Sequence, residues 1–160
     1  MTPTRGGTMT PAELQDLDSA LKIFSLCLEE PCVPGELEGW IKAVWEAVQR
    51  VRPVLYKHLT RNHQEHFADI VEEDTEMFRQ VTLLKKEDEN ILQHFHALSE
   101  RASKLQEKAP RVGPNEAQLQ EDVSALITDG LAFVIQVQRQ GIAIRSWLQE
   151  AFLRDRGVAD

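Results

Sequence analysis

The chain has 160 residues, of which 42% are hydrophobic and 28% charged, a balance typical of a folded soluble domain rather than a disordered chain. Its formal net charge of −8 and lack of a basic stripe make it a poor candidate for binding nucleic acid or anionic lipid surfaces. It has no long apolar run and no apolar leader, so we expect no membrane span, no signal peptide and a cytoplasmic location.

The first expected helix begins at Thr10 and Pro11, after a flexible segment over residues 1–9. Thr10 suits the N-cap position and Pro11 suits the first helical position. Apolar residues then recur every three or four positions, which places them on one helix face: Leu14, Leu17, Leu21, Phe24 and Leu28. The Pro- and Gly-containing segment 30–35 is the loop that ends this helix.

A second apolar stripe covers residues 37–62, and Pro53 inside it is expected to kink or divide the helix because it removes a backbone donor. The acidic segment 67–75 is weakly patterned and is expected to turn the chain. A third stripe over residues 81–105 precedes the loop expected at 109–114, which contains two prolines and a glycine.

Asn115 is expected to cap the last helix, whose apolar stripe covers residues 119–151. Gly130 and Gly141 within this stripe are expected to allow close packing or a bend. Four long amphipathic segments joined by short loops predict an all-α protein, one domain over residues 1–160 folded as an antiparallel up-down four-helix bundle. A helical hairpin that completes its core as a homodimer is the alternative.

The two cysteines, Cys27 and Cys32, are too few for a disulfide scaffold. Their C-x4-C spacing crosses the expected end of the first helix. Two interpretations remain open: a pair of reduced thiols, which a cytoplasmic location favours, and a redox pair or half of a zinc site.

Each expected helix also places a polar side chain toward the interior of the bundle. These residues are Asp18 on the first helix, His58 and Asn62 on the second, Asp88 on the third and Gln140 on the last. Bundles build metal and cofactor sites from facing side chains of this kind. Since a buried carboxylate is costly without a partner, Asp88 is expected to have one. His63 and His66 have a spacing that can chelate a metal, or they contact the end of the bundle.

Three segments of the chain carry a resemblance to the hemerythrin-like (HHE cation-binding) four-helix bundles. Residues 55–62, LYKHLTRN, are similar to L-x-x-H-F-x-x-E, and residues 81–88, VTLLKKED, are similar to V-x-x-L-x-x-E-H. Residues 147–152, WLQEAF, followed by DRG at 155–157, resemble the ending L-L-Q-E-A-[FY]. In that family, histidines and bridging carboxylates from all four helices hold two non-haem irons that bind O2 or report oxygen, iron or redox state.

Carried over position by position, the resemblance implies that most of the iron ligands are lost. His58 alone matches a histidine ligand. The other ligand positions hold different residue types: Asp18, Asn62, Asp88, Gln140 and Ile144. Asn62 lacks the charge of the bridging glutamate, and Ile144 has no atom that binds a metal. A di-iron centre is therefore not expected.

Three functions are compatible with these residues. The first is a hemerythrin-like bundle without its di-iron site, a non-catalytic binding, signalling or structural module with a polar core and no cofactor. The second is a protein that holds a single Fe, Mn or Zn ion with Asp18, His58 and Asp88, with Asn62 and Gln140 as polar neighbours. The third is a helical adaptor for a protein partner. The sequence has no recognisable catalytic motif, so no enzyme activity is expected.

Overall fold

The computed structural model describes residues 11–73 and 75–157, and these residues contain helices and no strands. The all-α prediction is therefore confirmed. The elements, in chain order, are α1 (Pro11–Glu29), α2 (Leu37–Lys57), η1 (His58–Asn62), α3 (His63–Glu73), η2 (Thr75–Met77), α4 (Phe78–Val112), η3 (Glu116–Leu119) and α5 (Gln120–Gly157). Here η1 is a π-helix, and η2 and η3 are 3-10 helices.

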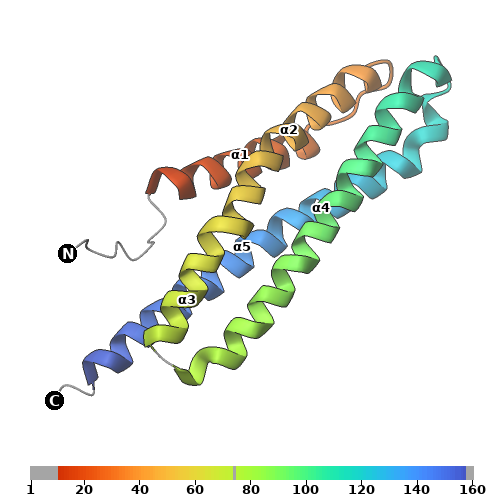
Figure 1. Ribbon diagram of the computed structural model, residues 1–160. Coiled ribbons are helices and arrows are strands. Elements are labelled where there is room, and N and C mark those ends of the chain that lie inside the picture. Colours follow the sequence, from red (N-terminus) through yellow and green to blue (C-terminus); the bar gives the residue numbers. More distant parts are fainter. Residues whose placement is uncertain (1–10, 74, 158–160) are drawn as a thin grey trace.

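The long helices pack side by side in a closed order. α1 packs against α2 and α5, and α4 packs against the same two helices. Through η1, α2 continues into α3, which packs against α4 and α5, so that these three elements form one rod (Figure 1). No helix in the described part of the chain is both long and apolar enough to cross a membrane.

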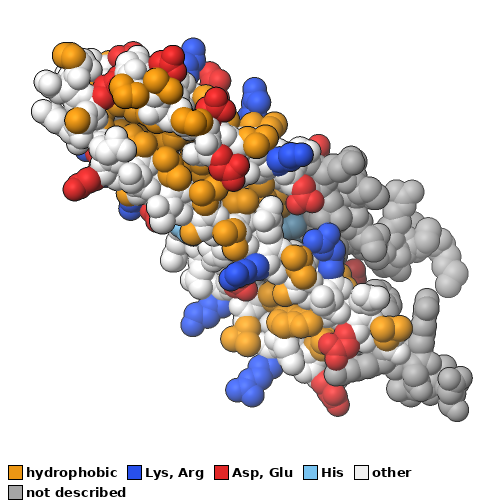
Figure 2. Space-filling model, turned by 180° about the vertical axis from the view of Figure 1, so that it is seen from behind, with side chains coloured by type: hydrophobic (Ala, Val, Ile, Leu, Met, Phe, Trp, Pro, Cys, Tyr) orange, Lys and Arg blue, Asp and Glu red, His pale blue; other side chains and the backbone are white. Residues whose placement is uncertain are grey.

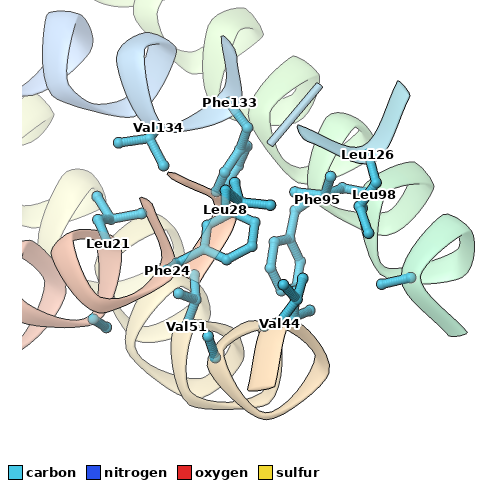
Figure 3. Close-up of a cluster of buried hydrophobic side chains, with 14 of the residues drawn as sticks. Leu21, Phe24, Leu28, Val44, Val51, Phe95, Leu98, Leu126, Phe133 and Val134 are labelled. Carbon is cyan, nitrogen blue, oxygen red and sulfur yellow. The ribbon is translucent and has the colours of Figure 1, made fainter. Parts of the chain in front are cut away.

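The main core fills the space between α1, α2, α4 and α5. Its centre contains Phe24, Phe95 and Phe133, and the rings of Phe95 and Phe133 lie with their centroids 5.6 Å apart (Figure 3). A second, smaller core lies where α3 packs against α4 and α5. Its buried residues are Phe67, Ile70, Met77, Val81, Leu84 and Ile144.

The second helix and the segment after it differ from the sequence prediction. Pro53 does not divide the helix, because α2 continues as an α-helix to Lys57 and the interruption is the π-helix η1. Segment 67–75 does not turn the chain over most of its length, because α3 continues to Glu73. The acidic composition of this segment obscured the helical pattern of its two buried residues, Phe67 and Ile70.

The connection before the last helix is also shorter than expected. Pro110 lies inside α4, which ends at Val112, and Gly113 follows with a positive φ of 53°. Ala109 is buried in the main core, and this burial keeps the helix intact past the point where loop residues begin. Asn115 precedes η3 rather than α5 directly, and its side chain makes no capping hydrogen bond.

The close packing expected at Gly130 is confirmed. Gly130 of α5 faces α1, and a Cβ there would overlap Cδ1 of Leu28 and lie 3.2 Å from Cζ of Phe24. Both neighbours are buried in the main core, so a Cβ at this position requires the end of the Leu28 side chain to shift within packed surroundings. Gly39 in α2 is the opposite case, since a Cβ there would meet nothing within 4 Å.

We predict that Gly130→Ala lowers the free energy of unfolding by about 1–3 kcal/mol, because overpacking outweighs the better helix propensity of alanine. The matched variant Gly39→Ala should raise the same quantity by up to about 1 kcal/mol. Urea denaturation of both variants provides the measurement. An equal gain in stability at the two positions would contradict the close approach of α1 and α5.

Candidate functional site

A buried polar cluster separates the two hydrophobic cores. It consists of His58 in η1, His63 at the start of α3, Asp88 in α4 and Gln140 in α5. Three of these side chains are almost completely buried, with exposed fractions of 6% for His58, 1% for His63 and 1% for Gln140. The cluster therefore forms a polar layer between the helices, and its hydrogen bonds must be satisfied inside the protein.

The sequence places this layer between the cores by simple helical spacing. On α4, Leu84 of the second core and Ile91 of the main core flank Asp88. On α5, Val137 of the main core and Ile144 of the second core flank Gln140. Residues three or four apart share a helix face, so both polar side chains point in the same direction as their buried neighbours.

The π-helix η1 brings His58 and His63 onto one face of the α2–α3 rod. On a regular α-helix, residues five apart point about 140° away from each other. In η1 the backbone N–H of His63 donates to the carbonyl of His58, which is the five-residue spacing of a π-helix. The two imidazole rings consequently pack edge to face, with centroids 4.0 Å apart and planes inclined at 64°.

The Asp88 carboxylate is the centre of the cluster. The Nδ1–H of His63 donates to both carboxylate oxygens, with Nδ1–oxygen distances of 2.8 and 2.9 Å. Nε2 of Gln140 donates to Oδ1 of Asp88 at 2.5 Å. Because a carboxylate only accepts hydrogen bonds, these contacts fix the proton of His63 on Nδ1 and turn the amide nitrogen of Gln140 toward Asp88. The prediction that Asp88 has a partner is confirmed.

The amide of Gln140 is only partly satisfied by these contacts. Its nitrogen also approaches the carbonyl of Leu84, at 3.5 Å, which is a long hydrogen bond. Its carbonyl oxygen Oε1 is buried and accepts no hydrogen bond from the described residues. A buried oxygen without a donor lowers stability, so the Gln140 amide contributes through its nitrogen rather than its oxygen.

The structure brings together three of the predicted site residues, His58, Asp88 and Gln140. Asp18 does not join them, because its side chain is exposed on α1 and the prediction that it faces the interior is wrong. The stripe of α1 is narrow, and Leu17 and Leu21 occupy the buried positions beside it. The side chain of Asn62 lies outside what the structure describes.

Sequence reasoning paired His63 with His66 and did not place it in the cluster, where it touches both Asp88 and His58. Four-residue spacing from His58 points to Asn62, and the extra residue in η1 moves the inward position to His63. The π turn has no motif in this sequence. The sequence feature that could have revealed the contact is a pair of histidines five positions apart on a predicted helix. It points to a contact only if a π turn is assumed between them.

Among the side chains that the structure describes, no three from His, Cys, Asp or Glu are grouped in a way that could hold a metal ion. Asp18, His58 and Asp88 therefore do not form a ligand set in this arrangement. Cys27 and Cys32 are free thiols. Burial raises the pKa of both thiols; Arg50 partly offsets this at Cys27, whereas Glu116 and Glu36 raise the pKa of Cys32 further, so the less nucleophilic protonated form is favoured at both.

A separate apolar groove lies between α1 and the start of α2. Ile23 and Leu26 form one wall, and Trp40 and Ala43 form the other. Glu30 and Glu36 also line the groove. Figure 2 shows hydrophobic side chains with acidic neighbours at the end of the molecule that carries the α1–α2 connection. This surface is distinct from the polar cluster, because none of the four cluster residues lines the groove.

Glu87 precedes Asp88 and is half-buried. Burial raises the pKa of the Glu87 carboxyl, repulsion from Asp88 raises it further, and His63 lowers it. A raised pKa in the folded state means that the charged form of Glu87 is less stable there than in the unfolded chain. Its contribution to stability is therefore favourable at low pH and is lost as the pH rises through the folded-state pKa.

We predict that Asp88→Ala lowers the free energy of unfolding by about 2–4 kcal/mol, because buried donors of His63 and Gln140 lose their acceptor. The control Glu89→Ala changes an exposed neighbour on the same helix and should alter stability by less than about 0.5 kcal/mol. Urea denaturation compares the two. Equal effects would show that the polar cluster contributes nothing to stability.

We also predict that Glu87→Gln stabilises the protein at pH 7, because glutamine mimics the protonated carboxyl at every pH. The gain should shrink as the pH falls and disappear at about pH 3, where Glu87 is protonated in both the folded and the unfolded state. Denaturation at the two pH values measures the difference, with Glu89→Gln as the exposed control. A gain that persists unchanged at low pH would contradict the raised pKa.

Comparisons of the chain with protein-family models, with curated proteins and with solved structures find no match. The role of the polar cluster must therefore be inferred from its own side chains. Those side chains form a hydrogen-bonded layer in which an imidazole from α3, a carboxylate from α4 and an amide from α5 meet.

Proposed function

We propose that this protein is a hemerythrin-like antiparallel bundle in which a hydrogen-bonded cluster takes the place of the metal centre. It would act as a non-catalytic binding or signalling module. The course of the helices supports the fold, since consecutive segments double back at short connections and α5 closes the order by packing on α1 (Figure 1). The resemblance of residues 55–62 and 81–88 to the family supports the kinship.

The observation that carries the proposal is the engagement of both Asp88 oxygens by His63, with Gln140 as a further donor to one of them. A metal ion at this point would compete for the same oxygen lone pairs. N–H groups of His63 and Gln140 already donate to these oxygens. The cluster therefore satisfies the hydrogen bonds of the Asp88 carboxylate without a metal cation.

The donor set also does not fit a di-iron centre. Two cations need bridging carboxylates, and Asp88 is the carboxylate that the described residues bring into the cluster. Gln140 contributes a neutral amide. Ile144, one turn farther along α5, is buried in the second core at a position where the resemblance implies a carboxylate. The second core has replaced one side of the former site with apolar packing.

Burial argues against a catalytic role for the His63–Asp88 pair. A histidine held by a carboxylate is also the arrangement that orients the base in many hydrolases. His63 is only 1% exposed, however, and its ring is covered by His58 and Phe67. A substrate would have to displace both rings before it reached the imidazole.

The experiment that tests this function is metal analysis of protein purified after growth with added iron, combined with thermal unfolding. We expect well under one metal per chain, and a Tm that stays the same with Fe(II), Mn(II) or Zn(II), because a ligand stabilises only the state that binds it. Asp88→Ala should lower the Tm equally with and without metal.

A stoichiometric metal with a rise in Tm that Asp88→Ala abolishes would overturn the proposal. That result would favour the mononuclear site with Asp18, His58 and Asp88 as ligands. Two irons per chain would instead show that the family's centre is retained.

A further inference from the structure

A second groove leads from the surface to the polar cluster. It lies between α1 and α5 and has a volume of about 450 Å³. Leu17 and Leu21 line it on the α1 side, and Val137 and Ile142 line it on the α5 side. His58 of the polar cluster also lines the groove, although the residue as a whole is buried.

Two cations from opposite walls line the same groove. Lys22 projects from α1 and Arg145 from α5, with Asp18 as the acidic residue among the lining side chains. Neither Lys22 nor Arg145 makes an ion pair with any residue that the structure describes. The groove therefore carries a net positive charge on a molecule whose overall charge is −8.

The position of Arg145 leaves its terminal nitrogens available. Its Nε–H donates to the carbonyl of Gly141 one turn earlier, at 3.2 Å, which holds the side chain along the wall. Gly141 lines the same groove, and a Cβ there would meet only Nη2 of Arg145, at 3.9 Å, so no other side chain that the structure describes packs over this position. A guanidinium held in this way presents paired N–H donors that match the two oxygens of a carboxylate.

We propose that this groove binds a small monocarboxylate with a short aliphatic body. The carboxylate would lie between Lys22 and Arg145, and the aliphatic part would lie against the leucine and valine walls toward His58. The proposal rests on the binding-module function, and it names the ligand class of that module. It also gives the polar cluster a purpose, since the His58 ring that lines the groove packs against His63, and Asp88 holds His63 in turn.

The balance of charges distinguishes this ligand from the alternatives. Lys22, Arg145 and Asp18 together give the wall a charge of +1, which favours a ligand with a single negative charge. A metal cation or an organic ammonium would be repelled by Lys22 and Arg145. The apolar part of the wall favours an alkyl chain, which acetate lacks, so hexanoate is expected to bind more tightly than acetate.

The test is a titration of the full chain with hexanoate, followed by backbone amide NMR shifts. Saturable shifts are expected around Lys22 and Gly141, and hexanol and hexylamine should give none. Arg145→Gln and Lys22→Gln should each raise the Kd for hexanoate by about tenfold or more, since each removes a charged partner of the carboxylate. Arg139→Gln is the control, because Arg139 is exposed on α5 outside the groove.

A Kd that Arg145→Gln and Lys22→Gln leave unchanged, equal binding of hexylamine, or the absence of saturable shifts would overturn the proposal. Metal content is measured on the same samples, which keeps the two failures apart. A metal-free protein that fails to bind hexanoate refutes the groove alone, whereas stoichiometric metal refutes the binding-module function on which the groove proposal rests.

Discussion

The hydrogen bonds that the Asp88 carboxylate accepts from His63 and Gln140 tie α3, α4 and α5 together at a level where the hydrophobic packing is interrupted. A buried carboxylate is strongly unfavourable unless its partners are in place, so these three side chains depend on one another. The dependence extends outward. His58 packs against the ring of His63 and lines the α1–α5 groove, so a contact in the interior holds one of the side chains of that groove.

Much of the fold follows from spacing alone. Leu17, Leu21, Phe24 and Leu28 were expected on one face of the first helix, and all of them are buried. Asp88 was expected to have a partner because an isolated buried carboxylate is costly, and two donors reach it. These inferences succeed because they use either the period of the α-helix or the energy of a single buried group.

The remaining features depend on contacts between distant parts of the chain. Local composition favoured a turn over residues 67–75, but burial of Phe67 and Ile70 against α4 and α5 makes the segment helical. Pro110 ends a helix in isolation, yet the packing of Ala109 keeps it within α4. Asp18 lies at the edge of a face that leucines fill. Gly130 is the converse case, where a weak helix former is kept because α1 approaches too closely for a side chain.

The π turn of η1 has a consequence for kinship at the level of single positions. A rod with such a turn contains one residue more than an unbroken α-helix that follows the same path. A related chain without the turn would be one position out of step with this one through all of α3. Aligning the two residue by residue would pair Asn62 with the counterpart of His63 and would assign the buried side of α3 to solvent. Insertions and deletions between positions 58 and 62 are thus where common ancestry of such bundles is most easily obscured.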